Sequence, residues 1–509
     1  MRSKIADSFY AHAARHPEKC AIWCDGQTRT YGEMARLVSQ YSHLLQAHGV
    51  QYADHIAIPM NNSIESVALF FSAADLGLCL VPLNPTLPFE AMITAIEASD
   101  IRHLIARKSF LKECQKHGGL PLQGMTLCLN AEFEGAVPFA EIEKMPTYRP
   151  ESADLRGDES FILTMTSGST GAPKPIDISQ QNKVDRVYAH VREYGITADD
   201  RVLAATPLYH SLAERLVILP LMIGATAILL PRFTPRLWLE CARQQAATFT
   251  IAVSAQLAQI LPLLESDETA PIDSFRAIVS SSALLEPAVK RRLIERLKCE
   301  FHEMYGTSEV STATTICFQK ARHKEQSVGR PFEGVRLRIL DDRGKDCPVG
   351  EMGEIAVASA LTCKGYYKQT SQVMLATQGA FFLTGDLGRL DEDGYLYFMG
   401  RKKELIITGA VNVSPSDVDA VVAKLPGVAE CAAFSYPDAR LGEVVALAVV
   451  KEPEAGLTAR QIQRYCAHHL ADFQQPHHIF FVDALPKNAM GKLQRMKIID
   501  VIPQHHGRN

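Results

Sequence analysis

Two hydrophobic patterns alternate along the first half of the chain. Apolar residues at helical spacing in YGEMARLVSQYSHLLQAHGV (31–50) precede the short apolar run DHIAIPM (54–60), and SIESVALFFSAADLGLCLVPLN (63–84) repeats this order. Further apolar runs follow in DRVLAAT, TAILL, TFTIAVS and FRAIVSSS. Helices that alternate with strands predict parallel pairing and an α/β fold, in which ligands bind at the carboxyl ends of the strands.

The pattern changes near residue 335. Short strands with intervening turns are predicted in VRLRILDDRGK (335–345), GEIAVAS (353–359) and GYLYFMG (394–400), which indicates a small antiparallel subdomain. After GRKKELI, a capped helix in SPSDVDAVVAKLPG (414–427) and two strands resemble a further α/β segment. We therefore expect a large N-terminal domain at 1–402 and a small C-terminal domain at 403–509.

Composition and charge narrow the classes of partner. The 509 residues are 47% apolar and 22% charged, and the net charge of -4 argues against a surface that neutralises nucleic acid or anionic lipid. The longest apolar run, LVILPLMIGATAILL (216–230), contains Pro220 and Gly224 and predicts two buried elements rather than a membrane span. The amino terminus lacks a signal-peptide pattern, and the twelve cysteines lack CxxC spacing, so we expect a cytoplasmic protein with reduced thiols.

A loop of small residues, TSGSTGAPK (166–174), follows the predicted strand SFILTMT (160–166). Such a loop can bring backbone N–H groups and hydroxyls against phosphate oxygens, and Lys174 adds a positive charge. It fits neither the Walker A pattern nor GxGxxG, and a plain surface loop is the alternative. The candidate phosphate-binding residues are Thr166, Ser167, Gly168, Ser169, Thr170, Gly171 and Lys174.

Further motifs accompany this loop in a fixed order: TYGEM (30–34), VPLNPTLP (81–88), MYGTSEVST (304–312), LTGDLGRLDEDGYLYFMGRKKELI (383–406) and LPKNAMGKLQRMK (485–497). Together they resemble the core motifs of the adenylate-forming superfamily, which contains acyl-CoA synthetases, peptide-synthetase adenylation domains and luciferases. The resemblance implies an α/β fold, with α/β subdomains and a small β-barrel-like subdomain in the N-terminal domain, and a small, mobile α+β C-terminal domain.

The resemblance also implies a reaction. A carboxylate attacks the α-phosphate of ATP to give an acyl adenylate and pyrophosphate, and a thiol then displaces AMP. Because two anions approach each other, the site must supply positioning and positive charge, with Mg²⁺ as cofactor. We expect the thiol to be coenzyme A; the alternative is the phosphopantetheine of a carrier protein, loaded with an acyl or amino acid.

Three residues are expected to act on the reacting groups. Lys492 resembles the family's catalytic lysine, which contacts the substrate carboxylate and the α-phosphate. Glu309 resembles the magnesium ligand, with Thr166 as a second ligand. His210 resembles the gate at the entrance of the acyl pocket. For Lys492 the alternative without the motif is a solvated lysine in a basic tail.

Other residues are expected to hold the nucleotide and the thiol. Asp386 and Arg401 resemble the pair that reaches the ribose, and Tyr305 resembles the aromatic that lies against adenine. Lys403 resembles the hinge of the C-terminal domain, and Gly409 resembles a position in the pantetheine tunnel. The remaining expected nucleotide contacts are Ser282, Gly306, Thr307 and Ser308.

The sequence departs from the family pattern at several positions. Pro175 replaces a common glycine after the loop lysine, and Ser281 and Ser282 replace a common Gly-Gly pair. Beside the predicted acyl pocket stand Glu214 and Arg215. We expect these two charges to pair with each other or to face solvent; alternatively, one of them recognises a polar group of the substrate.

Two other classes of function stay open at this point. A nucleotide-binding regulatory or scaffold protein could keep the fold without turnover, although the presence of Lys492, Glu309 and Asp386 argues against it. A light-emitting enzyme has no supporting feature. The expected partners are a small carboxylic acid, ATP and coenzyme A, with a carrier protein as the alternative and with no nucleic acid; the expected assembly is a monomer or a homodimer.

Overall fold

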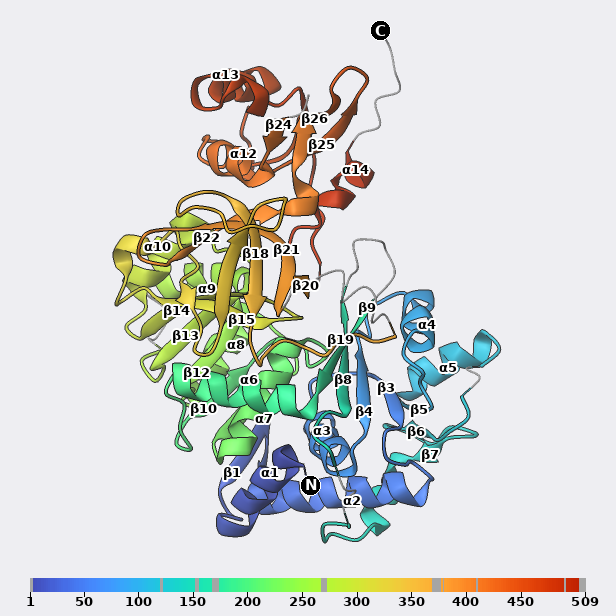
Figure 1. Ribbon diagram of the computed structural model, residues 1–509. Coiled ribbons are helices and arrows are strands. Elements are labelled where there is room, and N and C mark those ends of the chain that lie inside the picture. The colour runs from blue at the N-terminus through green and yellow to red at the C-terminus, as the bar shows by residue number, and fades with distance from the viewer. Residues whose placement is uncertain are drawn as a thin grey trace. The chain divides into compact units, whose positions relative to one another are not determined.

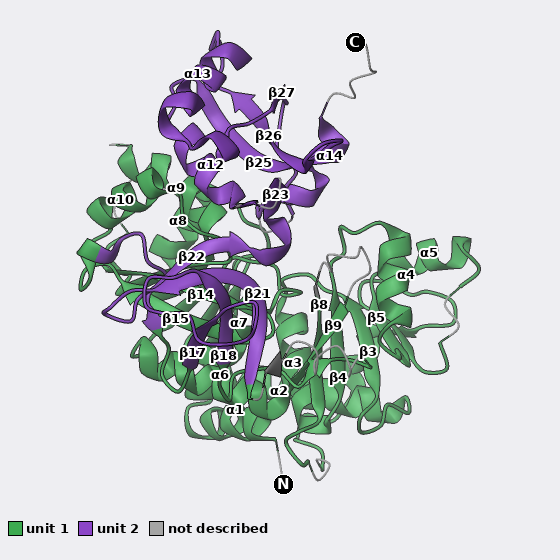
Figure 2. Ribbon diagram, turned by 45° about the horizontal axis from the view of Figure 1, so that its top comes forward, with its two compact units in different colours: residues 1–323, 331–335, 358–380 green, residues 324–330, 336–357, 381–509 purple. Residues whose placement is uncertain are grey.

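The chain forms two compact units, which Figure 2 shows in different colours. The computed structural model describes residues 3–119, 122–151, 155–166, 174–266, 272–368, 377–378, 380–408, 411–488 and 491–502. Unit 1 comprises residues 1–323, 331–335 and 358–380, and unit 2 comprises residues 324–330, 336–357 and 381–509. Neither unit is one continuous stretch of chain.

The first sheet of unit 1 is mainly parallel, with the antiparallel strands β2 and β15 toward its two ends. Its strands are, in spatial order, β2 (Gln27–Thr30), β1 (Cys20–Cys24), β11 (Thr226–Leu229), β10 (Arg201–Ala204), β12 (Phe249–Val253), β13 (Ala277–Ser281), β14 (Glu300–Thr307), β15 (Ser311–Cys317) and the short β16 (Arg330–Pro331). All residues of β12 and β13 are buried. This is the pattern expected of parallel strands covered on both faces.

The second sheet of unit 1 contains a hairpin that the sequence did not predict. Strand β9 pairs antiparallel with β8, so that the loop expected to bind phosphate joins two strands. The strands are, in spatial order, β19 (Gly365–Tyr366), β9 (Lys174–Ser179), β8 (Ser160–Thr166), β4 (Cys79–Leu83), β3 (His55–Pro59), β5 (His103–Ala106), β6 (Thr126–Cys128) and β7 (Val137–Pro138).

Helices pack around the strands of unit 1 (Figure 1). The apolar run 216–230 forms the end of α7 and strand β11, as predicted, because Gly224 ends the helix in the left-handed conformation at φ 82°. The helices are α1 (Lys4–Arg15), α2 (Tyr31–Ala47), α3 (Ile64–Leu76), α4 (Phe89–Glu97), α5 (Lys108–Lys116), α6 (Gln180–Glu193), α7 (Ser211–Ile223), α8 (Pro235–Gln244), α9 (Ser254–Glu265) and α10 (Pro287–Arg296).

Unit 2 contains the predicted antiparallel strands and the predicted α+β segment. The first group is β17 (Arg336–Leu340), β18 (Gly353–Ala358), β21 (Phe381–Leu390) and β22 (Leu396–Arg401). The second group comprises β23 (Ile406–Thr408), β24 (Val411–Val413), β25 (Val428–Asp438), β26 (Gly442–Lys451), β27 (His478–Phe481), α12 (Pro415–Val422), α13 (Ala459–His469) and α14 (Ile498–Val501).

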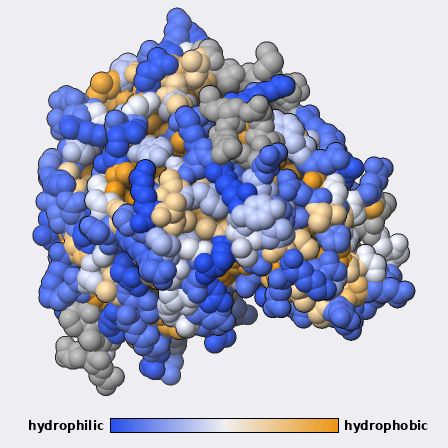
Figure 3. Space-filling view, turned by 90° about the horizontal axis from the view of Figure 1, so that it is seen from below, coloured by the Kyte–Doolittle hydropathy of each residue, from blue (hydrophilic) through white to orange (hydrophobic). Residues whose placement is uncertain are grey.

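Short elements complete the description: β16 (Arg330–Pro331), β20 (Thr377–Gln378), η1 (Phe139–Lys144), η2 (Arg322–Lys324), η3 (Lys402–Glu404), η4 (Asp472–Gln474) and η5 (Arg495–Lys497). Within the described part of the chain, no helix has both the length and the hydropathy needed to cross a bilayer. Polar residues cover most of the face seen in Figure 3, and its apolar residues lie in small separate patches.

Candidate active site

The β8–β9 hairpin positions the lysine of the phosphate-binding motif. Thr166 and Lys174 are paired across the two strands, at the end where the loop joins them. The side chain of Thr166 and residues 167–173 lie outside the described residues, and with them the predicted positions Ser167, Gly168, Ser169, Thr170 and Gly171. The described hairpin therefore fixes the two ends of the loop and places Lys174 beside it.

A tight turn joins β14 to β15 and carries the YGTSE motif. Tyr305 on β14 is 9% exposed, and the turn follows at residues 308–310, after β14 ends at Thr307. A Cβ atom on Gly306 would lie 1.7 Å from the carbonyl oxygen of Ser311, so only glycine permits this approach of the two strands. Ser311 itself has φ 65°, an uncommon value for a residue with a side chain.

Glu309 and Lys174 converge on Tyr366, a residue that the sequence analysis did not single out. The Tyr366 hydroxyl donates to Glu309 Oε1 over 2.8 Å, and the amide of Cys363 donates to the Glu309 carbonyl over 2.7 Å. Lys174 Nζ lies 5.7 Å from the centre of the Tyr366 ring. A cation and a carboxylate are thus brought to one place in unit 1, as a site for a metal-bound phosphate chain requires.

The substituted Gly-Gly position keeps a backbone geometry suited to glycine. Ser282 is exposed and has φ 77°, which explains why glycine is favoured there, whereas Ser281 is buried at the end of β13. The Ser254 hydroxyl contacts the hydroxyl of Ser280 over 3.1 Å and donates to the Ser281 carbonyl over 3.2 Å and to the Ala283 carbonyl. These contacts hold the turn in a conformation that its serines disfavour.

His210 lies directly before α7 and packs against Tyr209, with ring centres 4.6 Å apart. Its Nε2 atom is buried and has no hydrogen-bond partner among the described residues. Burial lowers the pKa of His210 to about 4. The imidazole at the predicted gate is therefore neutral near pH 7.

Glu214 and Arg215 correct the sequence-based expectation. They do not face solvent, because both are buried, with relative exposures of 0% and 5%. They also do not pair with each other. Glu214 Oε2 lies 2.7 Å from Lys183 Nζ, whereas Arg215 donates to the Ser311 hydroxyl over 3.0 Å. Consecutive residues of a helix point in different directions, so these two charges find separate partners.

Unit 2 brings the two predicted ribose-binding residues together. Asp386 on β21 and Arg401 on β22 are cross-strand partners, and Arg401 Nε lies 3.2 Å from Asp386 Oδ1. Asp386 is 3% exposed. A carboxylate that accepts hydrogen bonds beside a guanidinium that donates them suits a pair of ribose hydroxyls.

The predicted hinge residue lies between two anchored neighbours of unit 2. Lys402 Nζ lies 3.0 Å from Glu354 Oε2, whereas Glu404 Oε2 lies 3.2 Å from Nε of Arg495 in the C-terminal segment. Lys403 is exposed between them. Gly409 lies outside the described residues.

Lys492 lies in a closed loop after β27. The Lys492 amide donates to Asn488 Oδ1, and the Asn488 amide donates to the Lys492 carbonyl, each over 2.9 Å. Gly491, with φ 72°, permits the turn directly before Lys492. These two hydrogen bonds fix the backbone position of Lys492.

A group of possible metal ligands that sequence spacing did not reveal lies on β14 and β15. Ligand atoms of Glu300, His302 and Cys317 all lie within 4.8 Å of one another. Lys320 Nζ lies 2.7 Å from Glu300 Oε1, and His302 Nε2 lies 3.2 Å from Glu300 Oε2. The lysine already neutralises the carboxylate, so Glu300 and Lys320 form an exposed ion pair beside the buried His302.

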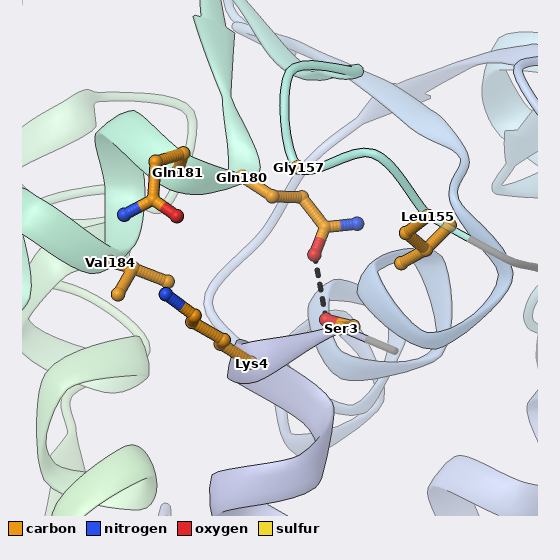
Figure 4. Close-up of a pocket in the computed structure, with 7 residues that line it drawn as sticks. All are labelled: Ser3, Lys4, Leu155, Gly157, Gln180, Gln181 and Val184. Atoms are coloured by element: carbon orange, nitrogen blue, oxygen red, sulfur yellow. Dashed lines mark hydrogen bonds between the residues drawn. The ribbon is translucent and has the colours of Figure 1, made fainter. Parts of the chain in front are cut away.

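A small pocket of unit 1 lies where α1 and α6 begin (Figure 4). The hydroxyl of Ser3 donates to Oε1 of Gln180 over 2.6 Å, which joins the start of α1 to the start of α6. No predicted site residue lines this pocket. Its lining consists of Ser3, Lys4, Leu155, Gly157, Gln180, Gln181 and Val184.

Comparisons with known proteins identify the family. The model of the AMP-binding enzyme family matches residues 9–367, and that of the AMP-binding enzyme C-terminal domain matches residues 417–492. The chain belongs to the AMP-binding enzyme family. This confirms the resemblance inferred from the motifs and the predicted fold class.

Relatives of this AMP-binding enzyme are similar over nearly their whole length. Indoleacetate–CoA ligase of Aromatoleum aromaticum is 28% identical, with 95% of each chain covered. The structure of ATP-bound MatB from Rhodopseudomonas palustris superposes with a TM-score of 0.88 at 26% identity, with 98% of each chain covered. For o-succinylbenzoate CoA synthetase (MenE) of Bacillus subtilis with its acyl-adenylate intermediate, the TM-score is 0.86 and the identity 28%, again with 98% of each chain covered.

These findings establish the reaction class. The AMP-binding enzyme is an acid–thiol ligase that activates a carboxylic acid with ATP as an acyl adenylate, releases pyrophosphate and transfers the acyl group to coenzyme A. The predicted coenzyme A ligase is thereby confirmed. The comparisons do not favour the alternative in which a carrier protein is loaded.

The buried His210 generates a prediction about pH. Because its pKa is about 4 in the folded protein and about 6.5 when exposed, the unfolded chain binds more protons between these values, and stability falls as the pH decreases through this range. Between pH 7 and pH 5 we expect wild type to lose about 2 kcal/mol more unfolding free energy than His210→Gln, measured by urea unfolding. Equal losses in the two proteins would contradict the burial of a neutral imidazole.

Proposed function

We propose that Lys174 and Glu309 bind the phosphate end of ATP in unit 1. The observation that carries this proposal is their convergence on Tyr366, where the Lys174 ammonium lies 5.7 Å from the ring centre and the Glu309 carboxylate accepts the hydroxyl over 2.8 Å. Lysine supplies a point charge for phosphate oxygens, and the β8–β9 loop supplies backbone N–H groups.

We further propose that Glu309, with the hydroxyl of Thr166, holds the Mg²⁺ that accompanies ATP. A single carboxylate with hydroxyl oxygen fits this cation, because Mg²⁺ prefers hard oxygen ligands and retains several waters and phosphate oxygens. When bound, the cation neutralises phosphate charge while the carboxylate of the acid approaches. Tyr366 orients the Glu309 carboxylate through its hydrogen bond.

The proposed contacts with the ribose, the adenine and the α-phosphate follow from the family motifs. Asp386 accepts hydrogen bonds from the ribose hydroxyls, and Arg401 donates beside it. Tyr305 lies against adenine, and Ser308 serves the α-phosphate. Ser282, Gly306 and Thr307 then line the nucleotide through backbone and hydroxyl groups, which suits their place at strand ends next to tight turns.

Lys492 is proposed to act at the point where charge accumulates. Its ammonium contacts the acid's carboxylate and the α-phosphate together, which lowers the repulsion between two anions during adenylation. Lys403 is proposed as the hinge between domains 1–402 and 403–509, because its neighbours Lys402 and Glu404 are anchored to different parts of unit 2. The neutral His210 gates the acyl pocket, and Gly409 lines the path of the thiol.

One experiment tests the proposed function and names the substrate class. Pyrophosphate release from ATP and Mg²⁺ is measured over a panel of fatty, aryl, dicarboxylic and amino acids, each without acceptor, with coenzyme A and with a phosphopantetheinylated carrier protein. We expect release that depends on one class of acid and is accelerated by coenzyme A. If only the carrier protein accelerates release, the acceptor is a carrier protein rather than coenzyme A. If none of the acids gives pyrophosphate release, the proposal is overturned.

The role of Lys492 predicts that the two half-reactions respond differently to substitution. Lys492→Ala is expected to slow adenylation by about 10²- to 10³-fold, as for the loss of one preorganised charge, and to leave thiolysis of a supplied acyl adenylate within about threefold. Lys487→Ala is the matched control, because Lys487 belongs to the same loop but is paired with Glu430 over 2.7 Å. Equal slowing of both half-reactions would contradict the role.

The proposed hinge role of Lys403 predicts the converse pattern, in which thiolysis slows and adenylation continues. Lys403→Pro fixes one backbone torsion, so we expect adenylation to continue while thiolysis falls by at least about tenfold. Lys403→Ala removes the charge and keeps the torsional freedom, and it is expected to retain both steps. Single-turnover kinetics of each half-reaction distinguish these outcomes; a full thiolysis rate in Lys403→Pro would place the hinge elsewhere.

A further inference from the structure

Helix α6 presents three basic side chains to the protein interior. Lys183 and Arg186 are each 2% exposed, and His190 is 0% exposed. Basic side chains are rarely buried to this degree unless specific partners accept hydrogen bonds from them. The partners of these residues therefore indicate what the buried face of α6 is for.

Arg186 binds two separate loops of unit 1 through their backbones. Its Nε donates to the Leu361 carbonyl over 2.9 Å, and one terminal nitrogen donates to the carbonyls of Ser308 and Glu309 over 3.3 and 3.1 Å. The loop at 361–366 carries Tyr366, the hydrogen-bond partner of the Glu309 side chain. One guanidinium thus joins the backbone of Glu309 to the segment that orients its carboxylate.

His190 and Arg215 hold the next residues of the same turn. Arg215 can only donate, so His190 Nε2 accepts from it over 2.8 Å, and the ring proton resides on Nδ1, which donates to the Arg186 carbonyl over 2.7 Å. Thr312 also contacts Nε2 over 3.1 Å, and the second terminal nitrogen of Arg215 binds Ser311. Burial and Arg215 hold the pKa of His190 well below its usual value, as this neutral acceptor requires.

Helix α6 is itself fixed at its amino-terminal end. Gln180 donates to the Ala74 carbonyl over 2.8 Å and accepts from Ser3 (Figure 4). Asn182 donates to the Thr362 carbonyl over 2.9 Å, next to the Leu361 carbonyl that Arg186 binds. The helix can therefore act as a rigid support for both loops.

The supported turn is strained. Ser311 has φ 65°, and the carbonyl of Ser311 lies so close to Gly306 that no Cβ could be added there. A non-glycine residue in this conformation persists only where its surroundings impose it. The hydrogen bonds from Arg186 and Arg215 to Ser308, Glu309 and Ser311 are side-chain contacts that can impose it, together with the pairing of β14 with β15.

We propose that Arg186, supported by neutral His190 and by Arg215, is a positioning residue that presents the Glu309 carboxylate to Mg²⁺. This inference rests on the proposed role of Glu309 as the magnesium ligand. A lysine cannot replace the arginine, because a single ammonium cannot reach three carbonyls in the fixed planar arrangement of a guanidinium. The conservative variant therefore keeps the buried charge and loses the geometry.

The test measures ATP binding by isothermal titration calorimetry, in saturating magnesium chloride and in EDTA, and needs no knowledge of the acid. We expect Arg186→Lys to weaken the affinity measured with Mg²⁺ by about tenfold, the effect of losing a charge-assisted hydrogen bond, and to change the affinity in EDTA by less than about twofold. An equal loss under both conditions, or no loss under either, would overturn the proposal.

Two further variants separate the possible failures. Arg276→Lys is the matched control, because Arg276 also donates to a backbone carbonyl, that of Tyr194, and pairs with Asp200 away from the turn. Glu309→Gln tests the proposed function: if it leaves the effect of Mg²⁺ intact, the metal role of Glu309 fails. If it removes the effect while Arg186→Lys does not, only the positioning role fails.

Folding is checked independently of nucleotide binding. Circular dichroism and the unfolding temperature of each variant show whether unit 1 remains intact. If Arg186→Lys does not fold, Tyr366→Phe removes only the hydroxyl that binds Glu309 Oε1 and is expected to produce the same selective loss of Mg²⁺-dependent affinity. An unchanged Mg²⁺ effect in Tyr366→Phe would contradict the proposed orientation of Glu309.

Discussion

The geometry of the turn that carries Glu309 depends on one buried guanidinium. Arg186 joins three carbonyls from two segments that are distant in sequence, those of Ser308, Glu309 and Leu361. Each hydrogen bond to a charged group stabilises by about 1.5 to 3 kcal/mol. A buried guanidinium without these partners would strongly destabilise the fold. The side chain and the two loops therefore require each other, and the turn before β15 cannot relax alone.

The position of Glu309 follows from this constraint. Glu309 is fixed at its backbone by Arg186 and Cys363, and its carboxylate is oriented by Tyr366. The ring of Tyr366 in turn lies beside Lys174 at the end of the β8–β9 hairpin. A sheet edge, a strained turn and a buried helix face thus meet at the place where a metal-bound triphosphate would need both a cation and a carboxylate.

Sequence patterns predicted most of the helices and strands, but they did not predict the buried side chains that hold the turn at Glu309. The strand at 160–166, the two buried elements at 216–230 and the antiparallel strands after 335 follow from local periodicity, and the motifs predicted the family. Strand β9 was not predicted because it is short and begins with Lys174 and Pro175, which do not give a strand pattern, although the helix expected from near Asn182 is present as α6. Arg186 and Tyr366 carry no motif, since basic residues at helical spacing usually face solvent, and only the tertiary fold brings residues 186, 309 and 366 together. The prediction for Glu214 and Arg215 was wrong for the same reason. Their partners are distant in sequence: Lys183 lies on α6, and Ser311 is the first residue of β15.

The most direct test of this account is a crystal structure of the protein with ATP and Mg²⁺. The account predicts a Glu309 carboxylate oxygen about 2.1 Å from the cation, with Tyr366 still bonded to the same carboxylate and Arg186 still bound to the carbonyls of the turn. A cation coordinated without Glu309, or a turn that keeps its shape after Arg186 has moved away, would contradict it.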